Sequence, residues 1–264
     1  FPDLGVLYFR SDIVSQEDAQ KLKSGNYTWD DLFEMAEKYQ GEKGTEYGIL
    51  FQATNNEGLI CNLNEFTANF ENLEEGLKMM KRFVDASITP DDITAYNEGK
   101  TEAFVNGKAV FARNWPYMNG LFKENTEGVI SPDVVDYAPL PEGSTVGGWL
   151  VGINKNTKHL GAAKKFVEFL VGPEGQKINA TVGSYLPGYN ALLEDQDVLA
   201  ANKLLSSEGF KKALANTISR PVLGNYSEAS DKIITAAHAY LTKKNATDED
   251  LANAVKAIQQ ALGK

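Results

Sequence analysis

Residues 104–117 read Phe-Val-Asn-Gly-Lys-Ala-Val-Phe-Ala-Arg-Asn-Trp-Pro-Tyr, and this stretch is the most informative part of the sequence. Phe104 and Val105 indicate the last residues of a helix, and Asn106-Gly107 predicts a turn. The apolar run 109–112 that follows predicts a short buried strand. Arg113, Trp115 and Tyr117 come directly at the end of that strand. Ligand pockets of open α/β sheets lie at the carboxyl ends of strands. We therefore expect a ligand site here.

The aromatic residues suggest what kind of ligand this site takes. Flat rings beside a few fixed donors suit a sugar, whose apolar C–H patches are surrounded by hydroxyls. Trp115 and Tyr117 are candidates for stacking on a sugar ring, with core packing as the alternative for each. Gly148 and Trp149 form a second candidate pair, because glycine lets the backbone approach a ligand closely. The alternative is that Trp149 covers a helix.

Composition excludes several classes of protein. The chain has 264 residues, enough for one large domain or two, and 42% hydrophobic and 23% charged residues are typical of a globular protein. A net charge of −10 disfavours nucleic acids and anionic membrane surfaces as partners. A single cysteine permits no internal disulfide. Because the sequence starts with Phe1 rather than Met, we expect a processed or truncated product.

Hydrophobic periodicity predicts an α/β fold. Strands alternate with helices in the first part of the chain, and helices follow in the last part, which is the pattern of an α/β protein. The predicted strands are 4–9, 47–51, 109–112, 134–138 and 149–153, and the predicted helices are 28–39, 59–70, 73–84, 97–105, 159–171, 195–205, 208–216, 228–241 and 248–262.

Motifs for catalysis and cofactor binding are missing from the sequence. It has two histidines, no G-x-S-x-G elbow, no complete P-loop, no G-x-G-x-x-G and no Cys/His cluster, so we expect no cofactor and no metal. Glu57 and Glu65 lie eight residues apart on one predicted helix, close to the same face. Paired carboxylates could serve a glycosidase, or they could bind sugar hydroxyls or face solvent.

Several segments together resemble a known family. Residues 57–61, 104–117, 147–153 and 219–222, with the Ala-rich helix pair from Ser230 onward, resemble the extracellular solute-binding proteins of ABC sugar importers. The similarity is to the maltose-binding type, and it is greatest to the trehalose/maltose-binding members. It implies a periplasmic-binding-protein-like two-lobe fold (type II), N-terminally truncated, that acts as a receptor and not as an enzyme.

The resemblance also implies a division of the chain into lobes. Residues 1–4 correspond to a crossing between lobes, 5–146 and 191–264 to the second (C-terminal) lobe, and 147–190 to the remaining part of the first (N-terminal) lobe. Most of the N-terminal lobe is then missing from this sequence. We expect either that a separate chain supplies the missing segment or that residues 149–189 expose an apolar face.

The implied function is capture of a maltose- or trehalose-like di- or oligosaccharide between two lobes that close about a hinge. The implied partners are the membrane permease subunits of an ABC transporter, and the implied location is extracellular, periplasmic or anchored to the cell surface as a lipoprotein. Two alternatives remain from other classes: a carbohydrate-active enzyme that uses paired carboxylates, and an interaction domain without sugar binding.

The resemblance to this family implies further candidate residues for the site. An acid and an aromatic residue at the crossing correspond to Asp3 and Phe1. Arg220, in the loop before the last helices, either binds the sugar through its forked guanidinium group or forms a surface ion pair. The complete set of predicted ligand-binding residues is Phe1, Asp3, Glu65, Trp115, Tyr117, Gly148, Trp149, Arg220 and Tyr226.

Overall fold

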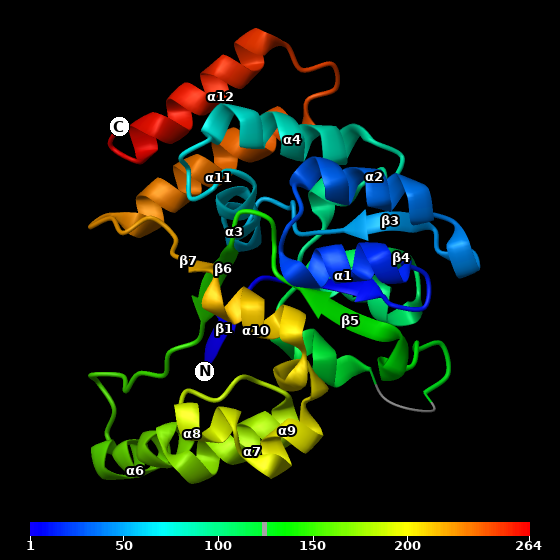
Figure 1. Cartoon of the computed structure of the whole chain (residues 1–264). Coiled ribbons are helices and arrows are strands. Elements are labelled where there is room, and N and C mark those ends of the chain that lie inside the picture. The colour runs from blue at the N-terminus through cyan, green and yellow to red at the C-terminus, as the bar shows by residue number, and fades with distance from the viewer. Residues whose placement is uncertain (123–125) are drawn as a thin grey trace.

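The computed structural model describes residues 1–122 and 126–264 (Figure 1). Its strands are β1 (Pro2–Leu4), β2 (Val6–Arg10), β3 (Tyr47–Leu50), β4 (Ala109–Asn114), β5 (Val135–Ala138), β6 (Ser144–Gly148) and β7 (Thr217–Ile218). Its α-helices are α1 (Gln16–Ser24), α2 (Trp29–Tyr39), α3 (Glu57–Phe66), α4 (Leu73–Asp85), α5 (Glu98–Thr101), α6 (Leu160–Val171), α7 (Pro173–Gly183), α8 (Asn190–Leu193), α9 (Gln196–Ala201), α10 (Glu208–Ala215), α11 (Tyr226–Thr242) and α12 (Asp248–Ala261). This mixture of helices and strands confirms the predicted α/β class.

A four-stranded sheet in the order β3-β4-β2-β5 organises the larger part of the molecule. Strand β2 is antiparallel to both β4 and β5, whereas β3 and β4 are parallel. Side chains alternate along β2, so that Leu7 and Phe9 enter one hydrophobic core while Val6 and Tyr8 enter another on the opposite face. Both faces of the sheet are therefore covered, and every residue of β4 is buried.

The first core lies between this sheet and helices α2, α3, α4, α11 and α12. Trp29 stacks on Phe66 with ring centroids 3.8 Å apart, which ties α2 to α3. Figure 1 shows α4, α11 and α12 together at the end of the molecule far from the N-terminus. Helix α2 begins at the predicted position with a capping box between Thr28 and Asp31, and Thr247 and Asp250 form another at the start of α12.

A separate three-stranded sheet, in the order β1-β6-β7, connects the two ends of the molecule. The expected strand 4–9 is divided at Gly5 into β1 and β2. The chain changes its partner strands at this point, because β1 pairs with β6 whereas β2 pairs with β4 and β5. The strand expected at 149–153 is absent, and β6 at Ser144–Gly148 pairs with β1 instead. Residues 149–153 form no strand because the pairing between β1 and β6 ends at Gly148, so that no partner strand continues beside them.

Residues 149–189 form the end of the molecule opposite to α12 and include α6 and α7 (Figure 1). Helix α6 buries none of its residues, and Leu150, Phe166 and Val182 are exposed. Ala180, at the end of α7, belongs to the same core cluster as Val198 of α9. The division of the chain into lobes stays a prediction. Within the described residues, no helix has both the length and the apolar character needed to span a bilayer.

Candidate functional site

A cavity of 610 Å³ lies between the paired strands β1 and β6 (the crossing strands), the start of α3 and the carboxyl end of β4. Its volume falls within the range of about 300–1,000 Å³ that is usual for small-molecule sites. Seven of the predicted ligand-binding residues line it, together with seven others. The lining residues are Phe1, Asp3, Asn56, Glu57, Gly58, Cys61, Glu98, Trp115, Tyr117, Gly147, Gly148, Trp149, Tyr185 and Arg220.

Strand β4 delivers Trp115 and Tyr117 to the cavity, as the sequence predicted. Asn114 Oδ1 accepts the backbone N–H of Trp115 at 2.8 Å, and the Tyr8 hydroxyl donates to the Trp115 carbonyl at 2.8 Å. Tyr117 lies in the 3-10 helix that follows, and its hydroxyl donates to Glu102 Oε1 at 2.8 Å. Burial and this carboxylate raise the pKa of Tyr117, so the phenol stays protonated. Hydrogen bonds therefore hold the backbone of Trp115 and the side chain of Tyr117.

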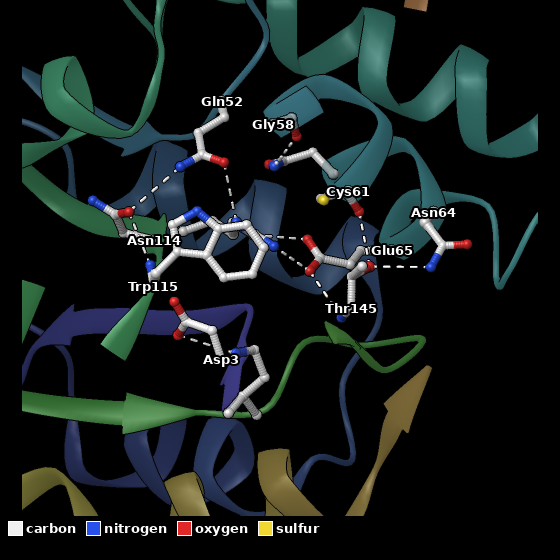
Figure 2. A network of polar contacts seen from close by, with 12 residues as sticks. Asp3, Gln52, Gly58, Cys61, Asn64, Glu65, Asn114, Trp115 and Thr145 are labelled. Atoms are coloured by element: carbon white, nitrogen blue, oxygen red, sulfur yellow. Dashed lines mark hydrogen bonds and ion pairs between the residues drawn. The ribbon is translucent and has the colours of Figure 1, made fainter. Parts of the chain in front are cut away.

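Arg113 lies against the Trp115 ring, with its guanidinium carbon 4.2 Å from the ring centroid. The guanidinium forms two hydrogen bonds with Glu65, from Nε to Oε2 at 2.8 Å and from Nη2 to Oε1 at 2.5 Å. Figure 2 shows the Glu65 side chain within this polar network. The side chain is completely buried and does not line the cavity. The expectation that Glu65 binds ligand therefore has to be corrected, because its oxygens face Arg113 and the backbone N–H of Thr145.

Asp3 places a carboxyl group in the cavity wall from β1. The residue is only 9% exposed, and burial raises the pKa of its carboxyl to about 7 despite a backbone hydrogen bond from Leu4 and the nearby charge of Arg113. Near neutral pH this carboxyl group exchanges between its protonated and ionised forms. It can therefore accept a hydrogen bond from a ligand hydroxyl, and in the protonated form it can also donate one.

Glu57, Arg220 and Tyr226 form a cluster on the cavity rim. Arg220 Nη1 donates to Glu57 Oε1 at 2.6 Å, and the Tyr226 hydroxyl donates to the same oxygen. Arg220 lines the cavity while it is ion-paired with Glu57, and its expected role in sugar binding stays a prediction. Tyr226 is not a lining residue, and its ring lies 5.7 Å from the Arg220 guanidinium. Tyr226 is connected to the cavity through Glu57, and direct contact of Tyr226 with a ligand stays a prediction.

The remaining wall is formed where β6 leaves β1. Trp149 is 70% exposed, and its backbone is bound to Phe1 through an N–H···O bond of 2.9 Å. Gly148 has a φ of +143°, and a Cβ there would lie 3.0 Å from the Phe1 carbonyl oxygen. The Phe1 ring packs against Tyr185 with centroids 4.2 Å apart. The backbone of this wall is thus fixed, while the Trp149 indole remains free to contact a ligand.

Sequence reasoning did not identify several of the lining residues. Asn56 caps α3 by accepting the N–H of Gly58 at 2.8 Å, and an Asn-x-Gly sequence before an apolar helical pattern was a usable signal for this helix start. Tyr185 and Glu98 gave no comparable signal, because nothing in their neighbourhood distinguishes them from other surface residues. Cys61 is buried and also borders the cavity.

The site offers little for catalysis. Among residues 1–122 and 126–264, no group of three or more His, Cys, Asp or Glu side chains could hold a metal ion. The two carboxylates of the glycosidase alternative, Glu57 and Glu65, do not face a common space. Glu65 is bonded to buried Arg113, while Glu57 is bonded to Arg220 on the rim. What the arrangement provides is a set of rings, hydrogen-bond donors and acceptors around a cavity.

Comparison with known proteins identifies the class of protein to which this α/β chain belongs. Residues 3–206 match the profile of the bacterial extracellular solute-binding proteins, and the chain belongs to this family. A probable ABC transporter-binding protein of Deinococcus radiodurans is 30% identical over 276 aligned residues, which cover 93% of this chain and 64% of the relative. The chain therefore spans less than two thirds of the length of this curated relative.

Solved structures agree with the family assignment. Maltose-bound MalE3 of T. maritima superposes with a TM-score of 0.82 at 29% identity, covering 98% of this chain and 71% of that one. A ribitol-bound ABC transporter solute-binding protein of Agrobacterium radiobacter gives a TM-score of 0.73 at 19% identity over 99% of this chain and 69% of that one, which shows the fold alone. These matches confirm the periplasmic-binding-protein-like fold, and the family is one of binding proteins rather than enzymes.

Proposed function

We propose that this protein is the carbohydrate receptor of an ABC importer and that its cavity takes a di- or oligosaccharide of the maltose or trehalose kind. The observation that carries the proposal is the Trp115 ring, which lines the cavity together with the polar residues Asp3, Glu98 and Arg220. An aromatic face with hydrogen-bonding groups around it matches a sugar ring, which is apolar above and below and hydroxylated at its edge.

The charges around the cavity favour a neutral sugar over an anionic one. Three acids, Asp3, Glu57 and Glu98, line it beside one arginine, Arg220, which is already paired with Glu57. A phosphate or carboxylate on the ligand would meet more acidic than basic groups. Similarity to maltose-bound MalE3, at 29% identity, supports an α-linked glucose disaccharide as the first candidate.

Binding of the ligand would be coupled to a movement of β1 and β6, the strands that cross between the two ends of the molecule. β1 and β6 carry Asp3, Gly147 and Gly148 into the cavity wall, so a hinge motion at these strands would move one wall relative to Trp115. The closed, sugar-bound form would then dock on the permease subunits of the transporter. Membership of an extracellular family supports a location outside the cytoplasm, either periplasmic or anchored at the cell surface.

We also propose that the lobe boundaries follow the family pattern, with 147–190 belonging to the first lobe. Two observations support this division: the exposed apolar side chains Leu150, Phe166, Phe169 and Val182, and the greater length of the relatives. In a longer form of the protein, additional first-lobe residues would cover these side chains and complete the second wall of the cavity.

Isothermal titration calorimetry against maltose, trehalose, maltotriose, mannitol and glucuronic acid tests the proposed function. We expect saturable heat with at least one of the three glucose oligosaccharides and none with glucuronic acid, together with no glucose release over several hours. Steady glucose release that is lost in Glu57→Gln would instead establish the enzyme alternative. Absence of binding to all five compounds would favour an interaction domain.

A further inference from the structure

The Trp115 ring has a buried ion pair behind it. The side chains of Arg113 and Glu65 are 2% and 0% exposed, and they form two parallel hydrogen bonds. We propose that Glu65 and Arg113 are positioning residues for ligand binding, which hold the Trp115 ring in its ligand-facing orientation without touching the ligand. This inference rests on the proposed function, since it concerns the same cavity.

The contacts of Arg113 reach Trp115 by two routes. The guanidinium plane lies against the indole, 4.2 Å from the ring centroid, and limits the ring's movement away from the cavity. Arg113 Nη1 also donates to Gln52 Oε1 at 3.2 Å. Gln52 Nε2 in turn donates to Asn114 Oδ1 at 3.4 Å, the same oxygen that accepts the Trp115 N–H (Figure 2). Ring and backbone of Trp115 are therefore both fixed by groups that Arg113 organises.

Glu65 connects the same pair to the crossing segments. Its Oε1 accepts the backbone N–H of Thr145 in β6 at 3.0 Å, and the Thr145 hydroxyl donates to the Cys61 carbonyl at 2.9 Å. Gly5, between β1 and β2, packs so closely on the pair that a Cβ would lie 2.1 Å from Glu65 Oε1 and 2.5 Å from Arg113 Nη2. Strand β6 and the connection between β1 and β2 at Gly5 therefore both contact the Arg113–Glu65 pair, which orients Trp115. The pair sets the position of this ring relative to the wall that Asp3 and Gly147 form.

Stability alone does not explain a buried ion pair at this place. Removing two charges from water is so costly that apolar residues of similar volume often serve a fold equally well. The contact of Arg113 with Gln52 continues through Asn114 to the Trp115 backbone, and its guanidinium lies against the Trp115 ring, which a positional role accounts for. Arg10 and Asp12 provide a matched comparison, because they form a similar two-bond pair in which Arg10 is 6% exposed, yet neither residue lines the cavity.

The test compares two double variants of the full chain. In Glu65→Leu/Arg113→Met the pair is replaced by apolar side chains, and in Arg10→Met/Asp12→Leu the matched pair is replaced in the same way. We expect both variants to unfold cooperatively on heating. We expect the first to bind maltose or trehalose at least tenfold more weakly than the parent, and the second to bind within twofold of the parent.

A spectroscopic measurement gives a readout that does not require a sugar. In a Trp29→Phe/Trp149→Phe background, Trp115 is the only indole, and its time-resolved fluorescence anisotropy reports how freely the ring moves. We expect faster decay when Glu65→Leu/Arg113→Met is added, and unchanged decay with Arg10→Met/Asp12→Leu. A parent that binds no sugar would defeat the proposed function, whereas the anisotropy result would still decide the positioning role.

A conservative variant covers the case in which the first double variant fails to fold. Arg113→Lys keeps the positive charge opposite Glu65 but loses the flat guanidinium and its second hydrogen bond. We expect a folded protein with weakened sugar binding and a more mobile Trp115. Parent-like affinity and parent-like anisotropy in Arg113→Lys, or in the folded double variant, would overturn the proposal and leave the pair with a structural role only.

Discussion

Asp3 lies directly opposite Gly147 in the antiparallel pair of β1 and β6, and both residues border the cavity. A Cβ on Gly147 would lie 2.9 Å from Cζ3 of Trp115 and 3.4 Å from Cβ of Asp3. The absence of a side chain at residue 147 therefore lets the Trp115 ring lie against the crossing strands. This arrangement brings a ring from β4 and an acid from β1 to the same wall.

The first prediction concerns this close approach. Gly147→Ala should displace the Trp115 ring and weaken sugar binding by about 1–2 kcal/mol, since an overpacked contact forces its neighbours to move. Gly152→Ala is the matched control, because a Cβ there would meet nothing within 4 Å. Calorimetry on both variants provides the measurement. Equal affinity in Gly147→Ala and Gly152→Ala would show that the ring position does not matter for binding.

The second prediction separates the two tryptophans of the cavity. Trp115→Ala and Trp149→Ala should each weaken disaccharide binding by at least about 1 kcal/mol, roughly fivefold, through loss of ring stacking. We expect the larger loss at Trp115, whose ring is held by Arg113, since the 70% exposed Trp149 must first be ordered by the ligand. Val222→Ala changes an exposed apolar residue outside the cavity and should leave affinity unchanged. If both Trp variants bind like the parent, the sugar site lies elsewhere.

The success of the prediction for β4 has a local cause. An apolar run after an Asn-Gly turn depends on neighbours in the sequence, and so does the capping box between Thr28 and Asp31. Both were therefore visible without a structure. The place of Trp115 at the end of β4 followed from the same local pattern.

The errors arose where distant residues decide the outcome. Glu65 lies on α3 with Glu57, and periodicity alone could not show that it is buried against Arg113, which is 48 positions away. Residues 149–153 are apolar enough for a strand, but a strand also needs a partner, and β1 ends its pairing at Gly148. Burial of an ion pair and the length of a sheet ladder are properties of the assembled fold.

The third prediction concerns the cluster on the rim. Arg220→Ala should weaken sugar binding more than Tyr226→Phe does, because Arg220 lines the cavity while the Tyr226 hydroxyl acts only on Glu57. We expect roughly a tenfold loss for Arg220→Ala and a loss below threefold for Tyr226→Phe. The two variants are compared by calorimetry with the same sugar. A larger loss in Tyr226→Phe would indicate that the position of Glu57, and not the guanidinium, governs binding.

The fourth prediction follows from the raised pKa of Asp3. Burial raises this pKa from 3.8 to about 7, so the folded protein binds a proton there that the unfolded chain releases. The free energy of unfolding therefore falls as the pH rises from about 4 to about 7, and the part due to Asp3 is at most about 4 kcal/mol at 1.36 kcal/mol per pH unit. This stabilisation is fully present below pH 4 and is lost above pH 7.

Urea denaturation of the parent and of Asp3→Asn at several pH values checks this prediction. Asparagine resembles the neutral acid and cannot ionise, so the stability of the parent relative to Asp3→Asn should decline between pH 4 and pH 7. Asp91→Asn, at an exposed position, is the control and should follow the parent at every pH. A constant difference between the parent and Asp3→Asn across this range would contradict the raised pKa.

The fifth prediction concerns the exposed apolar side chains of residues 149–189. Phe166 and Phe169 lie three positions apart on α6 and are 62% and 46% exposed, so they share one face of the helix. If first-lobe residues cover this face in a longer form of the protein, the 264-residue chain should self-associate through it, because exposed apolar patches of this kind drive association. Phe166→Ser/Phe169→Ser should shift the mass measured by light scattering toward the monomer without lowering the melting temperature. Leu214→Ser/Val222→Ser removes two exposed apolar side chains outside this segment and should leave the mass distribution unchanged. A parent that is already monomeric at high concentration, or an equal effect of both double variants, would show that the face on α6 does not need a partner.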